Sequence, residues 1–104
     1  MLLKKNRLTR LEVEEIKRRR TNPISSQYFG LVKLQKVGEP KFAVLISNKT
    51  AKSAVVRNHI RRTVYNTIQP ILNNQQGWYL FLAKKSIIDA KQDEVSKEII
   101  GLLR

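Results

Sequence analysis

The spacing of apolar residues near the start of the chain predicts a short helix. In the segment LTRLEVEEIKRRRT, Leu8 and Ile16 lie near helical spacing. Thr9 followed three residues later by Glu12 is the signature of a capped helix start. The Asn-Pro step after this segment disfavours helix in the residue before the proline. We therefore predict that the first helix ends before this step.

Three other segments have the composition of strands. Residues 27–36 (QYFGLVKLQK) and 41–47 (KFAVLIS) are rich in aromatic and branched side chains and flank the turn-like VGEP. Two strands joined by a hairpin are the simplest interpretation. The second run is almost continuously apolar, as in a strand that is covered on both faces. Residues 78–83 (WYLFLA) predict a further buried strand.

Two longer segments return to helical spacing. One has apolar residues at steps of four, four, four and three, which is the stripe of a single helix face; they are Val56, Ile60, Val64, Ile68 and Ile71. Residues 89–104 predict a last helix with four inward-facing residues, Val95, Ile99, Leu102 and Leu103. The order is helix, strand, strand, helix, strand, helix. This order predicts one domain, residues 1–104, of the α+β class with a small sheet.

The net charge indicates what kind of partner this domain has. The chain has 21 Lys and Arg against eight Asp and Glu, which gives a formal net charge of +13. Such an excess repels itself unless a polyanion neutralises it, and nucleic acid is the obvious candidate. An anionic membrane surface is the alternative, but no apolar run is long enough for a signal peptide or a transmembrane helix. With no cysteine for disulfides or thiolate zinc sites, we expect a cytoplasmic protein without a membrane partner.

The second predicted helix carries a cluster of cationic side chains. A rotation of about 100° per residue places a polar group on the arc beside the apolar stripe; it consists of Arg57, Asn58, Arg61, Arg62 and Tyr65. No acid occurs between Glu39 and Asp89, so mixed-sign pairs cannot form along this helix. A guanidinium binds phosphate oxygens through two donors and stacks on bases. The pattern therefore favours a nucleic-acid-binding surface over a merely solvated helix face.

The carboxylates are not arranged for catalysis. A two-metal nuclease needs clustered carboxylates that hold its ions about 4 Å apart. The eight acids here fall on the first helix, in one turn, and on or beside the last helix. No glycine-rich phosphate loop, Ser/His/Asp arrangement or metal-ligand spacing occurs. We therefore predict no catalytic and no metal-binding residue on the chain itself.

The segment SNKTAKSAVVRNHIRR resembles the Lys-rich loop and Arg-Asn signature of the bacterial ribonuclease P protein component. The order of elements is similar to that family over nearly the whole chain, and the specific part is the Ala-Val-x-Arg-Asn-x-x-Arg-Arg core. The resemblance implies a small α/β sandwich with a left-handed β-α-β crossover, against the usual right-handed rule.

The resemblance also implies a function and partners. Family proteins bind a large catalytic RNA that removes the 5′ leader of precursor tRNA, and hold the single-stranded leader in a cleft beside the sheet. Mg²⁺ and the RNA perform the hydrolysis. We therefore expect the catalytic RNA and precursor tRNA as partners, no cofactor on the protein alone, Mg²⁺ in the holoenzyme, and no obligate protein partner.

Carried across by position, the signature implies specific RNA contacts. Arg57, Asn58, Arg61 and Arg62 match the residues that face the RNA, and Lys49 and Lys52 match basic residues of the preceding loop. Tyr65 stands where the family often has a further arginine. One phosphate contact is therefore either replaced by stacking or lost.

The leader cleft departs from the family pattern. The first helix typically carries phenylalanines that line this cleft, whereas this chain has Val13 and Ile16. The sheet residues Tyr28, Phe29 and Val32 are therefore the candidates for the cleft. Tyr28 and Phe29 point to opposite faces of a strand. For each ring two alternatives remain: it is exposed and stacks on RNA bases, or it packs against the helices.

The same charge and helix pattern allow two other functions. A small ribosomal or other structured-RNA-binding protein would have a similar surface. A DNA-binding architectural protein would prefer duplex DNA to folded RNA at matched salt, but no tight helix-turn-helix pair surrounds the signature. We therefore predict a ribonuclease P protein subunit, with the structured-RNA-binding protein as the alternative.

Overall fold

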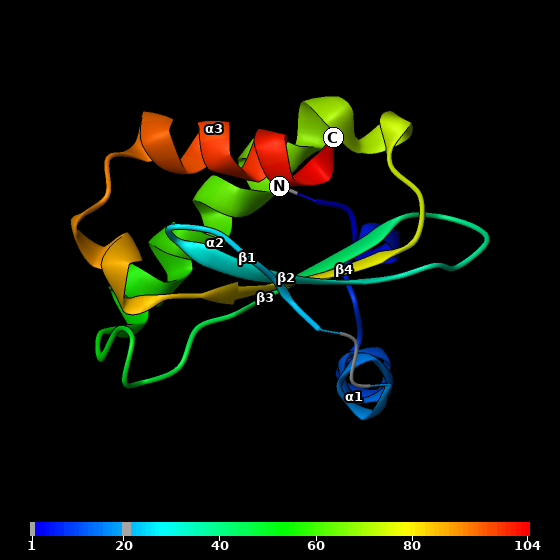
Figure 1. Cartoon of the computed structure of the whole chain (residues 1–104), viewed down its shortest axis with the longest axis horizontal. Coiled ribbons are helices and arrows are strands. Elements are labelled where there is room, and N and C mark those ends of the chain that lie inside the picture. The colour runs from blue at the N-terminus through cyan, green and yellow to red at the C-terminus, as the bar shows by residue number, and fades with distance from the viewer. Residues whose placement is uncertain (1, 20–21) are drawn as a thin grey trace.

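The chain folds around one four-stranded sheet (Figure 1). The structure is a computed structural model that describes residues 2–19 and 22–104. The strands are β1 (Ile24–Ser25), β2 (Phe29–Leu34), β3 (Lys41–Leu45) and β4 (Trp78–Ala83). The helices are α1 (Arg10–Arg18), α2 (Ala54–Ile68) and α3 (Gln92–Leu103), with 3-10 turns η1 (Lys4–Asn6), η2 (Gln69–Asn74) and η3 (Lys85–Asp89). Helices α2 and α3 cover one face of the sheet and α1 lies on the other, so the structure is α+β as predicted.

The strand order is β1-β2-β4-β3, which differs from the expected hairpin. β4 lies between the other two long strands, antiparallel to β2 and parallel to β3. The predicted pairing of β2 with β3 is therefore wrong, although both segments are strands. The central position suits WYLFLA because it buries this apolar run and pairs both of its backbone edges. The parallel strands β3 and β4 are joined through α2; the left-handed sense of this crossover stays a prediction.

The larger part of the core lies between the sheet and helices α2 and α3. On the sheet, the rings of Phe29 and Phe81 meet edge to face with centroids 5.5 Å apart. The predicted helix stripes point into this core: Ile60, Val64 and Ile68 from α2, and Val95, Ile99 and Leu103 from α3, are buried. Val56, at the start of the α2 stripe, is 38% exposed. The helical period of the apolar residues therefore predicted most of the side chains that α2 and α3 contribute to this core.

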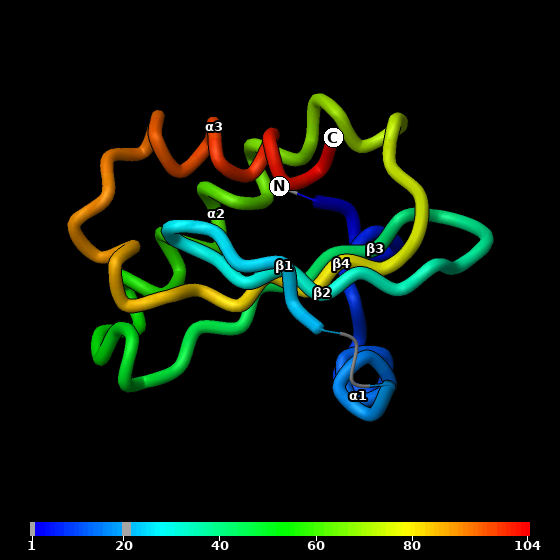
Figure 2. The backbone as a smooth tube through the Cα atoms, in the orientation of Figure 1, coloured from blue at the N-terminus to red at the C-terminus, as the bar shows by residue number. Residues whose placement is uncertain are grey.

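The N-terminal segment runs from the helix-covered side of the sheet to α1 (Figure 2). Arg7 forms an isolated parallel bridge with Phe42, and the Leu8 amide donates to the Phe42 carbonyl at 2.9 Å. The chain then enters α1 through the predicted capping box. The Thr9 amide donates to Glu12 Oε1 at 2.8 Å, and the Glu12 amide donates to Thr9 Oγ1 at 3.2 Å. The capped helix start is confirmed.

The face under α1 is covered more thinly. Ile16 is the one fully buried residue of α1, and it packs with Val32, Ala43 and Leu80 of the sheet. Leu11, on the other side of the helix, is 80% exposed. Leu45 and Leu82, at the ends of β3 and β4, are only half-buried. Part of this sheet face therefore remains open beside α1.

Candidate nucleic-acid interface

The loop between β3 and α2 presents the predicted lysines. The Thr50 amide donates to the Ser47 carbonyl at 3.0 Å and lies 3.2 Å from Ser47 Oγ, which makes a compact turn. Lys49 and Lys52 are both exposed on this loop. Ser53 then caps α2, because its Oγ accepts from the Val56 amide at 3.4 Å. The loop therefore delivers two cations directly to the N-terminal end of α2.

Arg57 has a structural contact in addition to any ligand contact. Its Nη1 donates to the Ala51 carbonyl at 2.8 Å and to the Lys52 carbonyl at 2.9 Å, and the side chain is half-buried. These bonds tie the basic loop to α2. A guanidinium has five N–H donors, so donors remain for a phosphate. Arg57 thus both positions the loop and contributes charge.

The remaining signature residues lie on the outer side of α2. Arg61 Nη1 donates to Asn58 Oδ1 at 2.7 Å, so the amide orients the guanidinium. Arg62 is exposed. Within residues 2–19 and 22–104, none of the arginines of α2 forms an ion pair with an acid. Their charges are therefore available to an anionic ligand.

Tyr65 borders this cationic surface without being fully exposed. It is half-buried and packs against the core under α2. Burial raises the pKa of its phenol, while the charges of Arg61 and Arg7 oppose the rise. The bridge between Arg7 and Phe42 places the N-terminal segment beside β3, and no local pattern in the sequence indicates this pairing.

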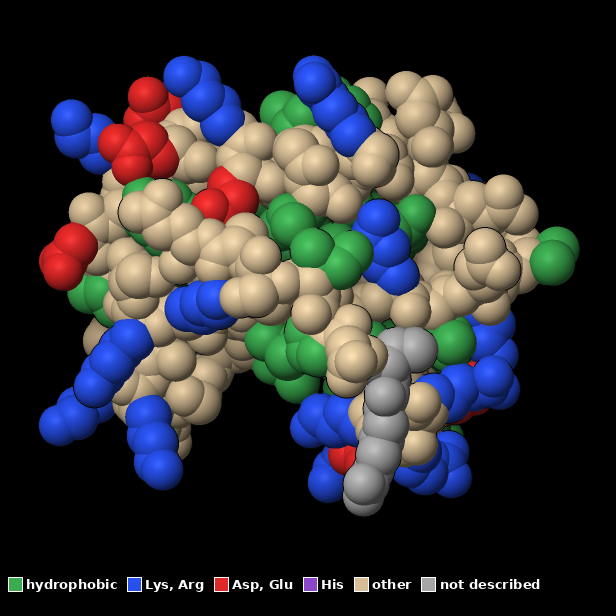
Figure 3. All heavy atoms as spheres, viewed as in Figure 1, with side chains coloured by type: hydrophobic (Ala, Val, Ile, Leu, Met, Phe, Trp, Pro, Cys, Tyr) green, Lys and Arg blue, Asp and Glu red, His purple; other side chains and the backbone are tan. Residues whose placement is uncertain are grey.

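The cationic side chains on the visible face fall into separate groups (Figure 3). Lys and Arg gather over the loop before α2 and over α1, and the surface is hollowed between these groups with hydrophobic side chains above the hollow. The acids gather mainly over the start of α3. The half-buried Leu45 and Leu82 belong to the sheet face on which α1 lies. This arrangement fits an extended polyanion that crosses the open part of the sheet.

The structure places the three cleft candidates differently. Phe29 is 0% exposed and lies in the core under α2 and α3, where it cannot reach a ligand. Tyr28 belongs to the same core, and its hydroxyl donates to Glu94 Oε2 at 2.7 Å. Val32 is on the α1 face but is covered by the cluster around Ile16. For Tyr28 and Phe29 the packing alternative is therefore correct, and neither residue lines the open sheet face.

Comparison with known proteins decides the family. The sequence model of the ribonuclease P family matches residues 2–104. The chain belongs to this family. The RNA-binding role of ribonuclease P proteins in tRNA 5′ processing agrees with the cationic surface on α2 and its loop. No curated protein sequence matches the chain.

Solved ribonuclease P proteins have the same fold. A Staphylococcus aureus RNase P protein mutant with defective mRNA degradation activity superposes with a TM-score of 0.86 at 14% identity, covering 96% of this chain and 86% of the other. The RNase P protein from Thermotoga maritima superposes with a TM-score of 0.79 at 15% identity, covering 93% and 94%. At such low identity the likeness concerns the fold. The ribonuclease P fold therefore spans almost the whole chain.

Two further properties concern metals and membranes. In the described part of the chain, His, Asp and Glu form no group of three that could hold a metal ion. No helix in the described ranges is long and apolar enough to cross a membrane.

Proposed function

We propose that this chain is the protein subunit of a ribonuclease P ribonucleoprotein. It binds the catalytic RNA through α2 and the preceding loop, and it holds the 5′ leader of precursor tRNA on the open sheet face beside α1. The arginines of α2, which form no ion pair with an acid within the described ranges, are the observation that carries this proposal.

The protein's own contribution is binding and orientation. Phosphate contacts by Arg61 and Arg62 position the RNA without reading its sequence. Arg57 keeps Lys49 and Lys52 beside the helix through its bonds to the loop. In this proposal the RNA, with its Mg²⁺, performs the hydrolysis, and the protein works in the cytoplasm without an obligate protein partner.

The leader site follows from the correction of the cleft residues. Its floor is the half-buried apolar end of the sheet, including Leu45 and Leu82, and its two sides are α1 and the basic loop. A single strand that crosses this floor would place its phosphates between two cationic groups. We expect binding to weaken steeply with salt, because each neutralised phosphate releases counterions.

Reconstitution tests the proposal. The protein is combined with a bacterial ribonuclease P RNA and precursor tRNA at low Mg²⁺, where electrostatic help from the protein matters most. We expect faster 5′ cleavage and tighter binding of the precursor than with RNA alone, and no cleavage by the protein alone. No gain in either quantity would refute the assignment. Cofractionation with ribosomal subunits would then support the structured-RNA-binding alternative.

A further inference from the structure

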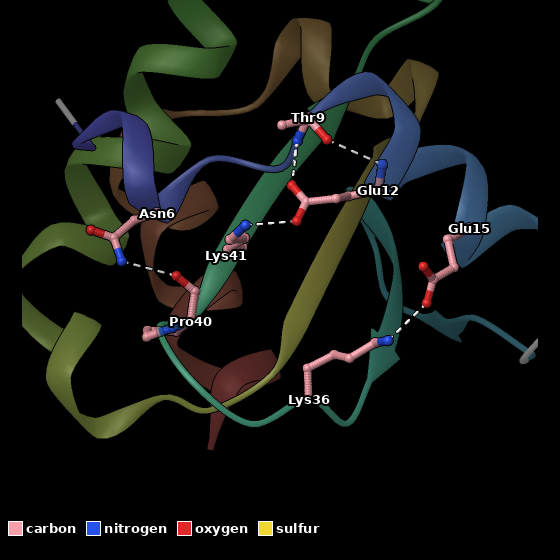
Figure 4. A network of polar contacts seen from close by, with 7 residues as sticks. All are labelled: Asn6, Thr9, Glu12, Glu15, Lys36, Pro40 and Lys41. Atoms are coloured by element: carbon pink, nitrogen blue, oxygen red, sulfur yellow. Dashed lines mark hydrogen bonds and ion pairs between the residues drawn. The ribbon is translucent and has the colours of Figure 1, made fainter.

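Two acids of α1 make direct contacts with lysines beside the sheet (Figure 4). Glu12 Oε2 lies 2.6 Å from Nζ of Lys41, the first residue of β3. Glu15 Oε2 lies 2.8 Å from Nζ of Lys36, in the connection between β2 and β3. The acids are three residues apart and so share one face of the helix. Together they attach α1 to the sheet at two points.

Both lysines also cover the same aromatic ring. Lys36 Nζ lies 4.7 Å from the centre of the Trp78 ring, and Lys41 Nζ lies 5.8 Å from it. Trp78 is half-buried and belongs to the cluster under α1. Each ammonium group is thus held between a carboxylate of α1 and the indole. Such cation–π contacts add to the attraction of the ion pairs.

These contacts add to the apolar contact between α1 and the sheet, to which the helix contributes few buried side chains. Ile16 is fully buried, whereas Leu11 is exposed and Val13 is only half-buried. The side chain of Glu12 is 17% exposed and that of Glu15 is 30% exposed, so both are shielded from solvent to a large degree. The two ion pairs therefore contribute to fixing the position of the helix.

The presence of two carboxylates beside a proposed polyanion-binding site needs a physical explanation. A carboxylate near a bound phosphate backbone repels it and weakens binding. Glu12 and Glu15 nevertheless lie on the helix that borders the open sheet face. An acid that acts only through repulsion would lower RNA affinity at this place. Their contacts with Lys41 and Lys36 indicate a different role.

We propose that Glu12 and Glu15 are positioning residues for the precursor leader. They hold α1 at a fixed place beside the open sheet face, and they keep Lys41 and Lys36 on Trp78 and away from arbitrary contacts with RNA. This inference rests on the function proposed above. It predicts that loss of the two negative charges weakens selective binding of leader-bearing RNA while general RNA affinity stays the same or rises.

The chain offers conservative variants and a matched control. Glu12→Gln keeps the capping geometry, since glutamine also completes a capping box, and it removes only the charge opposite Lys41. Glu15→Gln removes the charge opposite Lys36, together with the ion pair that Glu15 Oε2 forms with Arg19 Nη2 at 3.4 Å on the same helix. Glu14→Gln removes an identical charge from the same helix, at an exposed position with no ion pair in the described part of the chain. The control therefore separates positioning from net charge.

The main measurement uses the reconstituted holoenzyme. The ratio of affinities for precursor tRNA and mature tRNA is compared among wild type, Glu14→Gln and the double variant Glu12→Gln/Glu15→Gln. We expect the ratio to fall about three- to tenfold in the double variant, the range expected for two partly exposed ion pairs. The control keeps the wild-type ratio. The affinity of Glu14→Gln and of the double variant for the catalytic RNA, measured without tRNA, should equal or exceed that of wild type.

The fluorescence of Trp78 provides a second measurement, made on the protein without RNA, because Trp78 is the single tryptophan of the chain. We expect acrylamide to quench its fluorescence more strongly in the double variant than in wild type or Glu14→Gln. High salt should raise quenching in the wild type, because it screens the ion pairs.

The outcomes separate the two proposals. A wild-type holoenzyme that binds precursor and mature tRNA equally well would overturn the proposed leader site and this inference with it. A normal wild-type ratio that the double variant retains would overturn the inference alone. An equal loss of the ratio in Glu14→Gln would also overturn it, because net charge would then explain the effect.

Discussion

The two faces of the sheet are attached to their helices by different forces. Under α2 and α3, fully buried aromatic and aliphatic residues such as Phe29, Phe81 and Val64 form the contact. Under α1, a smaller apolar cluster of Ile16, Val32, Ala43 and Leu80 is supplemented by ion pairs from Glu12 and Glu15. Apolar burial is insensitive to ionic strength compared with exposed charge pairs. One face therefore supports the fold, and the other is suited to meet a charged ligand.

The first prediction removes a ring from the heavily packed face. Phe29→Ala should destabilise the protein by about 3–5 kcal/mol, because it deletes a fully buried side chain and leaves a cavity. Denaturant unfolding measures the loss, and Phe29→Leu should lose clearly less. A stable Phe29→Ala protein with impaired leader binding would instead place Phe29 in the leader cleft.

The second prediction concerns the thinly covered face. Ile16→Ala should cost about 2–4 kcal/mol of α1 attachment, and the loss should be local, because α2 and α3 keep their own core. Hydrogen exchange should show faster exchange in α1, while β4 and α2 remain protected. Uniformly faster exchange over the whole chain would show that the two faces unfold as one unit.

The third prediction separates two arginines on α2. Arg61→Ala and Arg57→Ala should each weaken binding of the catalytic RNA and reduce the salt slope by about one unit, as for one lost phosphate contact. Arg57→Ala should in addition lower the free energy of unfolding by about 1 kcal/mol, because it deletes the bonds to the Ala51 and Lys52 carbonyls. Arg57→Lys is the control for charge alone. Equal stability of the two alanine variants would contradict the structural role of Arg57.

The smallest expected effect is the acid sensitivity of the α1 attachment. Burial opposes ionisation of Glu12, but the hydrogen bonds from Lys41 and Thr9 outweigh it and lower its pKa. The hydrogen bond from Lys36 likewise lowers the pKa of Glu15. Because the folded-state pKa values are depressed, the stabilisation is present above the ordinary carboxyl value and is lost as the pH falls through the folded values.

The measurement for this titration is Trp78 quenching between neutral and acidic pH. Quenching should rise as the carboxylates protonate, with an effect below about 1 kcal/mol for the partly exposed Glu12 pair. The far-UV signal should change little until lower pH, since the α2 and α3 contacts are apolar. In Glu12→Gln the quenching at neutral pH should already be raised. A flat profile in the wild type would show that the ion pairs do not hold α1.

Several features were predictable because they depend on neighbours along the chain. The capping box of Thr9 and Glu12 has a spacing of three residues, and both of its hydrogen bonds occur. The apolar stripe of α2 required only the helical period, and Ile60 and Val64 are buried as expected. The clustering of Arg57 and Arg61 on one side followed from the same period. Local spacing along the chain therefore predicted where these helices lie and which side of α2 is buried.

Other features were not predictable because they depend on pairing between distant segments. The interpretation of β2 and β3 as a hairpin followed the short connection, whereas β4 inserts between them. Glu98 of the last helix accepts from Ser26 Oγ at 2.8 Å and from the Tyr28 amide at 2.7 Å, contacts that the sequence did not indicate. No spacing rule connects residues some seventy positions apart. For the same reason the sequence did not indicate the bridge between Arg7 and Phe42.

The sequence by itself determined the net charge of the chain and the helix on which its arginines cluster. Net charge and the period of the arginines are properties of composition and of one continuous helix, and both survive any change in strand order. The tertiary structure alone decided which sheet face stays open. It did so by inserting β4 between β2 and β3, by burying Phe29 and Tyr28 under α2 and α3, and by attaching α1 through Glu12 and Glu15. These outcomes depend on which apolar and charged groups from distant parts of the chain contact the sheet. Such contacts form only when the chain folds.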